Sequence, residues 1–278
     1  AGLRSEQVGT ESSLKTPLDS TYNTDYFKLY PTLHLNYKLD EYSSIMASYT
    51  RRVNRPRFNA LNPFPKYSDP YNLRMGNPFL RPEFVNSFEL GYQKFSRGTN
   101  FTSSIYAKDV NDLQRRFVEV DSNNVTTVTQ RNLNGSLDVG FEFMLSKQVS
   151  KSFNFMLSSN AYYSKVNASN LTSDFNESMF GMRSSFNTSW NKNGHKIQVS
   201  GWVRPGSNVT QGRMKTMFSS DIAYSRPIFS DQGKLTIRIS DVFNTQRFGI
   251  DTNGRNFDQS FDYNRLSRYL TVNLSYNF

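Results

Sequence analysis

The stretch that decides the fold is RYLTVNLSYNF, residues 268–278, in which apolar and polar side chains alternate. Thr, Asn and Ser fill the positions between the apolar residues. Successive side chains of a strand point to opposite faces, so this pattern predicts a strand with one apolar and one polar face. The apolar positions are Leu270, Val272, Leu274, Tyr276 and Phe278.

The same alternation recurs along the chain, most clearly at residues 27–39 and 137–145. Turn-rich connections separate these segments, and counting between them predicts about twelve strands. They are expected at residues 2–13, 26–39, 42–53, 84–95, 100–120, 125–146, 153–166, 178–190, 195–205, 212–225, 234–246 and 265–278.

Composition also indicates an all-β protein. The 278 residues include 16 Tyr and 23 Phe, and the mean hydropathy is −0.63. No stretch approaches the roughly 20 apolar residues of a spanning helix, which excludes a helical membrane protein. The richness in Tyr and Phe favours strands over helices. Because the chain has no Cys, it has no disulfide framework and no thiolate metal site.

The connections alternate between short and long. Short turns are expected at residues 40–41, 96–99, 191–194 and 230–233, and long loops at about 14–25, 55–83, 167–176 and 247–260. Transmembrane barrels have short periplasmic turns and long outer loops, and an even strand count leaves Phe278 at the periplasmic rim. The alternative is a soluble β-sandwich or β-solenoid. It is disfavoured because its apolar strand faces would lack any covering element. The sequence therefore predicts an antiparallel transmembrane β-barrel.

The formal net charge is +10, from 33 Lys and Arg against 23 Asp and Glu. The basic residues are dispersed, as at Arg51, Arg52, Arg55, Arg57, Arg115 and Arg116. No recognition-helix pattern accompanies them, so nucleic acid is not an expected partner. On a membrane protein such charges are expected to face anionic lipid head groups or an anionic solute.

Several stretches resemble the barrel of TonB-dependent outer-membrane receptors. They are ASYTRRVNRPRFNALNPF at 47–64, GNPFLRPEFVNSFELGY at 76–92, SDVFNTQRF at 240–248 and the terminal RYLTVNLSYNF. The last stretch is similar to the signal that the barrel-assembly machinery reads on a final strand. The resemblance implies a bacterial outer-membrane location, with lipid, the assembly machinery and the TonB complex as partners.

The chain departs from this family in one respect. Such receptors have a plug domain before a barrel of roughly 22 strands, and residues 1–278 contain neither a plug nor the first strands. We therefore expect residues 1–278 to be a single barrel region, the carboxy-terminal part of a larger receptor, whose missing plug region contacts the TonB complex. A complete passive pore of twelve strands is the alternative.

A barrel enzyme is a third possibility, since outer-membrane phospholipases resemble this chain in size. They need a histidine beside a serine nucleophile. His34 has no serine at the same-face positions Thr32 and Asn36, and His195 falls in a predicted turn. We expect no catalytic residue, no cofactor and no metal site.

Two groups of residues are candidates for contact with a solute. Loops on a rigid scaffold often carry recognition residues, which selects Tyr67, Tyr71, Arg74 and Asn77. Inward positions on later strands, where basic side chains attract anions, select Arg204, Arg213, Lys215 and Arg238. The alternatives are that the loop residues only shape the loop, and that the basic residues pair with Asp138, Glu142, Asp221 or a plug. The predicted function is uptake of a glycan, peptide or metal chelate.

Overall fold

The computed structural model describes residues 1–14, 20–171, 177–209, 211–230, 232–254 and 257–277. In these ranges it contains twenty strands and one helix of four residues, α1 (Phe58–Leu61). No helix of the described residues has the length and apolar character needed to cross a membrane. Almost all regular structure in this part of the chain is therefore β.

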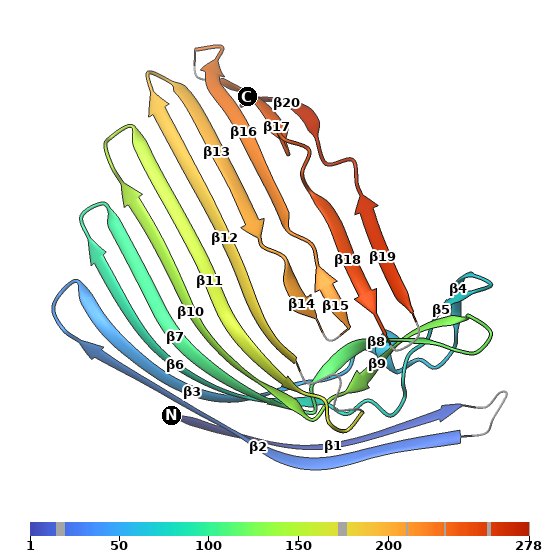
Figure 1. Cartoon of the computed structure of the whole chain (residues 1–278). Coiled ribbons are helices and arrows are strands. Elements are labelled where there is room, and N and C mark those ends of the chain that lie inside the picture. The colour runs from blue at the N-terminus through green and yellow to red at the C-terminus, as the bar shows by residue number, and fades with distance from the viewer. Residues whose placement is uncertain (15–19, 172–176, 210, 231, 255–256, 278) are drawn as a thin grey trace.

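Twelve strands form one antiparallel sheet, in which each strand pairs with its nearest main-sheet neighbours along the chain, as Figure 1 shows. This confirms the predicted strand count. The strands are β1 (Gly2–Leu14), β2 (Ser20–Lys38), β3 (Ser43–Asn54), β6 (Glu83–Ser96), β7 (Thr99–Asn111), β10 (Gly135–Gln148), β11 (Phe153–Asn167), β12 (Glu177–Lys192), β13 (His195–Arg204), β16 (Met217–Ile228), β17 (Gly233–Ser240) and β20 (Tyr269–Tyr276).

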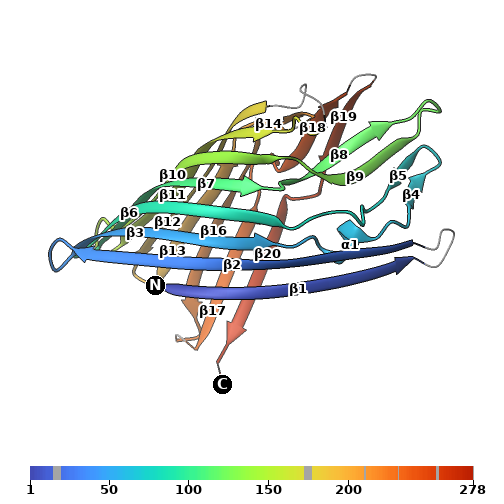
Figure 2. The same ribbon diagram turned by 90° about the horizontal axis from the view of Figure 1, so that it is seen from below.

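The main sheet is not closed into a ring. Within the described residues, β1 pairs only with β2 and β20 pairs only with β17. The sheet is curved, and its two outer strands lie apart (Figures 1 and 2). Each outer strand thus presents a free row of backbone hydrogen-bonding groups.

One face of the main sheet is mainly apolar from β2 to β20, whereas on β1 the same face carries Leu3 followed by Ser5, Gln7 and Glu11. Apolar residues lie opposite one another on neighbouring strands. Leu270 of β20 lies opposite Ile239 of β17, and Ile239 lies opposite Ile222 of β16. A similar run at the other side joins Tyr37, Ile45 and Tyr92. These side chains have no covering element. Examples with more than two fifths of the side chain exposed are Phe27, Leu35, Leu90, Ile105, Val139, Phe141, Tyr163, Phe180, Leu270, Val272 and Leu274.

The opposite face of the main sheet is polar and more crowded. The same registers place buried polar side chains there, at Tyr30, Thr50, Ser136, Ser164, Ser219, Ser225 and Ser240. Side chains converge on the inside of a curved sheet, so the polar face is the concave one. This division is that of a barrel in lipid, with an apolar exterior and a polar interior.

Two glycines allow tyrosine rings to lie flat on the polar face. Gly140 is directly opposite Tyr106, and a Cβ atom at Gly140 would lie 2.4 Å from Cζ of that ring. Gly181 has the same relation to Tyr162, also at 2.4 Å. A side chain at either glycine would displace the ring.

The end of the main sheet away from the short turns carries two small four-stranded sheets. We call these sheets, together with α1 and the connections that join them to the main sheet, the collar; Figure 2 shows β4, β5, β8 and β9 extending beyond the ends of β6, β7 and β10. The first comprises β4 (Lys66–Asp69), β5 (Asn72–Arg74), β9 (Thr126–Asn132) and β8 (Gln114–Val120). The second comprises β14 (Ser207–Val209), β15 (Gly212–Met214), β18 (Arg247–Asn253) and β19 (Asp258–Asn264).

The predicted strands 100–120 and 125–146 were wrong in their bounds. Each is divided in two where the main sheet ends and the collar begins. Asp112 has a φ of 57°, a left-handed conformation that ends β7. Beyond it the backbone N–H of Leu133 donates to the carbonyl of Leu113 at 2.7 Å, and the outer hairpin β8–β9 starts. Alternation alone does not reveal such a break, because it continues on both sides of it.

Four later predictions were also wrong in their bounds. The strand expected at 212–225 is split between β15 and β16, and that at 234–246 ends at Ser240 because Asp241 has a φ of 44°. The loop expected at 247–260 contains β18 and the start of β19. The terminal strand is shorter than residues 265–278, and Phe278 lies outside the described residues.

Candidate functional site

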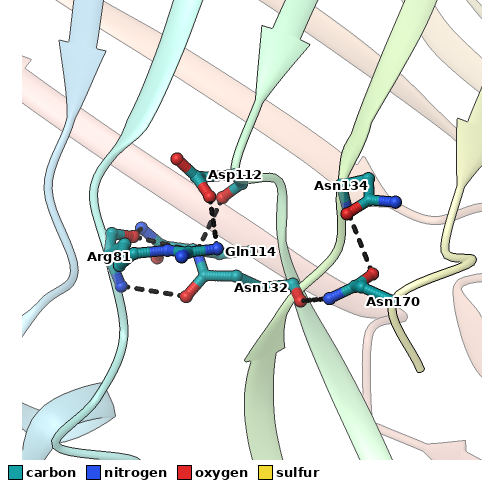
Figure 3. Close-up of polar contacts among 6 residues, drawn as sticks. All are labelled: Arg81, Asp112, Gln114, Asn132, Asn134 and Asn170. Carbon is teal, nitrogen blue, oxygen red and sulfur yellow. Dashed lines mark hydrogen bonds and ion pairs between the residues drawn. The ribbon is translucent and has the colours of Figure 1, made fainter.

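The base of the collar is held by an amide network around Asn132, which Figure 3 shows. The Oδ1 atom of Asn132 accepts from the backbone N–H of Arg81 at 2.9 Å, while Nδ2 donates to the carbonyls of Arg81 and Asp112. Arg81 also pairs with the Asp112 carboxylate at 2.6 Å. The carbonyl of Asn132 accepts from Nδ2 of Asn170 at 2.9 Å. Three separate connections are thereby joined.

A small apolar core lies at the same level. It consists of Val110, Leu113, Leu133, Val166 and Ala168, all buried. These residues come from the ends of β7 and β11 and from the breaks that start and end the β8–β9 hairpin. Apolar burial and the Asn132 network together fix this part of the collar on the main sheet.

A second fixed point is the turn after β17, where Asp241 is almost completely buried. Its carboxylate accepts from the backbone N–H groups of Thr245 and Gln246, at 3.1 and 3.0 Å, and from the hydroxyl of Ser267. Burial acts to raise the pKa of Asp241, but these hydrogen bonds outweigh it and hold the pKa below its usual value. Asp241 therefore stays ionised and ties both ends of the segment that carries β18 and β19.

The two collar sheets are joined by the buried side chain of Gln211. Its Oε1 atom accepts from the backbone N–H of Val118 at 2.8 Å, and its Nε2 atom donates to the carbonyl of Val118 at 3.0 Å. Val118 belongs to β8, whereas Gln211 directly precedes β15. One amide thus satisfies both backbone groups of a residue 93 positions away.

Between α1, β4, β5 and the β8–β9 hairpin lies a hollow of about 760 Å³. We call it the basic hollow, because its walls carry six basic side chains and one acidic side chain, Glu83. The basic residues are Arg55, Arg57, Lys66, Arg74, Arg115 and Arg116.

The predicted loop residues occupy different environments around this hollow. Arg74 lines it, while Tyr67 and Tyr71 are 67% and 62% exposed on the β4–β5 hairpin. The side chain of Asn77 donates to the carbonyl of Gln130 at 3.1 Å and accepts from the backbone N–H of Phe79 at 3.0 Å. These two hydrogen bonds mean that the side chain of Asn77 shapes the loop.

The four predicted lumen residues do not lie on one sheet. Arg204 ends β13, and Arg238 lies in β17, where it forms an ion pair with Asp221 of β16. Arg213 is exposed on β15 of the collar. Lys215 follows it and pairs with Asp262 at 2.8 Å and with Asp251 at 3.4 Å. Their carboxylate partners reduce the anion-attracting charge expected from Arg238 and Lys215.

The two histidines lie in different surroundings, and among the described residues no hydrogen bond joins either of them to a serine. His34 lies opposite Ser48 on the polar face. His195 opens β13, not a turn as predicted, and its Nδ1 atom lies 2.7 Å from the hydroxyl of Tyr224. Among the described residues, no three His, Cys, Asp or Glu side chains are grouped as metal ligands would be.

The sequence did not predict the basic hollow. Arg55, Arg57, Arg115 and Arg116 were interpreted as dispersed charge, with the first two in the long loop expected at 55–83 and the last two in the strand expected at 100–120. The structure brings these two segments together through the parallel pairing of β5 with β9, at Asn72 opposite Thr126. The available signal was that both segments carry arginine pairs close to the ends of main-sheet strands.

The outer membrane protein beta-barrel family matches the chain over residues 1–276. This chain belongs to that family. The barrel region lies in the bacterial outer membrane, and the collar is at the end where barrels of this kind have their long outer loops. No curated protein matches it in sequence.

Solved structures that share this fold include transporters and receptors. The copper transporter OprC has a TM-score of 0.72 at 10% identity, covering 99% of this barrel region and 44% of OprC. The ferric yersiniabactin uptake receptor FyuA from Yersinia pestis has 0.66 at 10% identity, covering 99% and 42%. An FrpB iron transporter from Neisseria meningitidis has 0.64 at 11% identity, also covering 99% and 42%.

These comparisons confirm the resemblance to the barrels of TonB-dependent receptors, at the level of the fold. At 10–11% identity, the copper transporter, the ferric yersiniabactin uptake receptor and the iron transporter show the fold that they share with this barrel region. This barrel region spans less than half the length of these neighbours.

Proposed function

We propose that this chain is the barrel region of an outer-membrane receptor that takes up a nutrient through TonB-dependent transport. The main support is a twelve-stranded sheet with an apolar outer face and a polar inner face. Almost the whole chain aligns with OprC and with FyuA, and it covers less than half of each of these longer proteins. The transport of copper, ferric yersiniabactin and iron belongs to those neighbours, and their identity to this chain is too low to carry a solute over.

The free edges of β1 and β20 support the second part of the proposal, that further strands of the same protein complete the barrel. A bilayer offers no hydrogen-bond donor or acceptor to an open sheet edge. In lipid, the backbone groups of β1 and β20 therefore require pairing partners. A larger barrel of the receptor type supplies them, and its interior has room for a plug.

The collar is the proposed recognition surface. It stands at the outer end of a rigid sheet, and the contacts of Asn132, Gln211 and Asp241 fix its segments in place. A preformed surface loses less entropy on binding than a mobile loop. Recognition there precedes energised passage through the barrel, with the TonB complex acting through the plug region and the assembly machinery recognising the terminal strand.

The experiment that tests this proposal uses the full-length protein from its complete coding sequence. Binding of the purified protein to the purified periplasmic domain of TonB is measured first. The ion conductance of the purified protein alone is then recorded in a planar bilayer. We expect binding to TonB and no steady conductance, since a plug fills the barrel. Steady ion conductance without TonB binding would overturn the proposal and favour a passive pore.

A further inference from the structure

We infer that the basic hollow binds a small polyanionic solute, one that carries several carboxylate or phosphate groups. This inference rests on the proposed receptor function and gives its solute a chemical class. Three observations support it: the positive charge of the hollow, the lack of acidic partners for most of its basic side chains, and the rigid backbone that holds these side chains.

The charges of the hollow are mostly uncompensated. Of its six basic side chains, Arg55 is paired, through Glu6 of β1 and the hydroxyl of Tyr26. No carboxylate in the described part of the chain forms an ion pair with the other five residues, which are Arg57, Lys66, Arg74, Arg115 and Arg116. Elsewhere in the collar, the basic residues Arg131 and Lys215 do have acidic partners. The hollow is thus a local excess of positive charge.

The one acidic residue of the hollow is already committed to the frame. Glu83 is buried, and its Oε2 atom accepts from Nδ2 of Asn54 at 2.6 Å. Its Oε1 atom accepts from the backbone N–H of Gln114, also at 2.6 Å. Glu83 therefore joins the ends of β3, β6 and β8, and its hydrogen bonds go to neutral groups instead of to an arginine.

Two of the unpaired arginines, Arg74 of β5 and Arg116 of β8, lie on the same face of the sheet with β9 between them. Partial burial lowers the pKa of Arg116, and the neighbouring charge of Arg74 lowers it further. Both guanidinium groups remain charged at neutral pH. An anion between them removes their mutual repulsion, which gives binding a favourable contribution that a neutral solute does not supply.

The floor of the hollow is preformed. Gly76 donates its backbone N–H to the carbonyl of Asn62 at 2.9 Å, and Asn77 donates to the carbonyl of Ala60 at 2.7 Å. A Cβ atom at Gly76 would lie 2.4 Å from the carbonyl oxygen of Asn62, so only glycine permits this approach. The parallel pairing of β5 with β9 then holds Arg74 beside the second wall.

The chemistry of the walls selects the solute class. Guanidinium groups bind carboxylate and phosphate oxygens through two parallel hydrogen bonds, and several such groups favour a multiply charged ligand. The amides of Asn59, Asn62 and Gln130 add neutral donors and acceptors. The volume of about 760 Å³ falls within the usual range for a small-molecule site.

The test measures binding to the purified full-length protein by calorimetry. Citrate represents clustered carboxylates, inositol hexakisphosphate represents clustered phosphates, and maltoheptaose is the neutral control. We expect at least one anion to bind, with affinity that falls as salt is raised, and no comparable binding of the neutral sugar. The double variant Arg74→Gln, Arg116→Gln is expected to weaken that binding at least tenfold.

The matched control is Arg97→Gln, which removes an exposed arginine from the short turn at the opposite end of the sheet. This variant should bind the anion as the unchanged protein does. Heat-modifiable migration on a gel verifies that each variant is folded. Equal anion binding by the double variant and the unchanged protein would overturn the inference, as would equal binding of maltoheptaose or no binding of either anion.

The inference and the proposed function fail in different ways. If the protein binds TonB but neither anion, the inferred solute class is wrong and the proposed receptor function stands. If the protein binds an anion but conducts ions steadily and does not bind TonB, the anion site stands and the protein is a passive pore.

Discussion

The main sheet and the collar are two β structures built by different physical means. In the main sheet, one face of the strands from β2 to β20 is mainly apolar and contacts lipid, so the period of the sequence is enough to orient these strands. In the collar, the strands are three to seven residues long, and polar side chains such as Asn132, Gln211 and Asp241 bond to the backbone of distant segments. The sheet depends on a repeated pattern, whereas the collar depends on individual residues.

This difference predicts two kinds of sensitivity to mutation. A substitution in the main sheet should act through the face on which it falls, and many positions on one face should behave alike. A substitution in the collar should act through the particular hydrogen bonds that it removes, and its neighbours should be tolerant.

The largest effect is expected for Ile105→Lys in the middle of β7. Ile105 is 56% exposed on the apolar face, between Leu90 and Phe141. A lysine near the bilayer midplane costs about 2–4 kcal/mol of folding free energy. Urea titration of the full-length protein in phospholipid vesicles measures this loss.

The matched control is Ser104→Lys, one residue away on the polar face. Ser104 lies opposite Gly91 and Glu142, so a lysine there meets a carboxylate and not lipid. Its effect should be much smaller. If both lysines cost the same, the two faces of the sheet are not divided between lipid and interior.

The next effect is expected for Asp241→Ala in the collar. The variant loses the hydrogen bonds from Thr245, Gln246 and the buried Ser267, and these donors lose their acceptor. The expected local cost is about 1–3 kcal/mol. It should appear as faster proteolysis within residues 241–268, while the unfolding of the main sheet is unchanged. A uniform loss across both regions would contradict their separation.

The depressed pKa of Asp241 adds a pH dependence with a defined sign. Because the folded protein holds the carboxylate ionised, its contribution is complete above the ordinary Asp value of about 3.9. It is lost as pH falls through the lower pKa of the folded state. Digestion by pepsin from pH 4 downward should therefore find the unchanged collar resistant at first and then susceptible. Asp241→Ala should be susceptible at pH 4 already, and identical profiles would refute this role.

The smallest effect is expected for Gln211→Ala. The substitution removes both hydrogen bonds to Val118, and water entering the vacated space offsets part of the loss, leaving about 1 kcal/mol. Hydrogen exchange at the Val118 amide should accelerate roughly fivefold. Gln211→Glu keeps an acceptor for the amide and should protect it better than alanine does. Equal protection in all three proteins would mean that Gln211 does not join the collar sheets.

How far the sequence predicted the structure follows the same division. Alternation located all twelve strands of the main sheet, and on every one of them except β1 the reason is a mainly apolar face that lies in lipid. It did not locate the breaks at Asp112 and Asp241, since a left-handed residue leaves no periodic trace. Nor did it predict the basic hollow, whose walls meet through the pairing of β5 with β9, two segments separated by more than fifty residues.

The candidate site was predicted only in part for the same reason. Arg74 was selected from its loop, and it does line the hollow. Arg55, Arg57, Arg115 and Arg116 were not selected, because local sequence gives the charge of a residue but not which distant loop it faces. The contact with solute of every selected residue, from Tyr67 and Tyr71 to Arg204 and Arg213, stays a prediction.

The central claim is that the main sheet meets lipid with one face only, and β20 offers the most direct test. Residues 1–278 contain no cysteine, so single cysteines at positions 269–276 can each carry a spin label in the full-length protein, once any cysteine outside this region is replaced by serine. Accessibility to oxygen, which concentrates in lipid, is then measured in vesicles. The account predicts high values at positions 270, 272 and 274 and low values at 271, 273 and 275. Equal accessibility along the strand, or the reverse alternation, would contradict it.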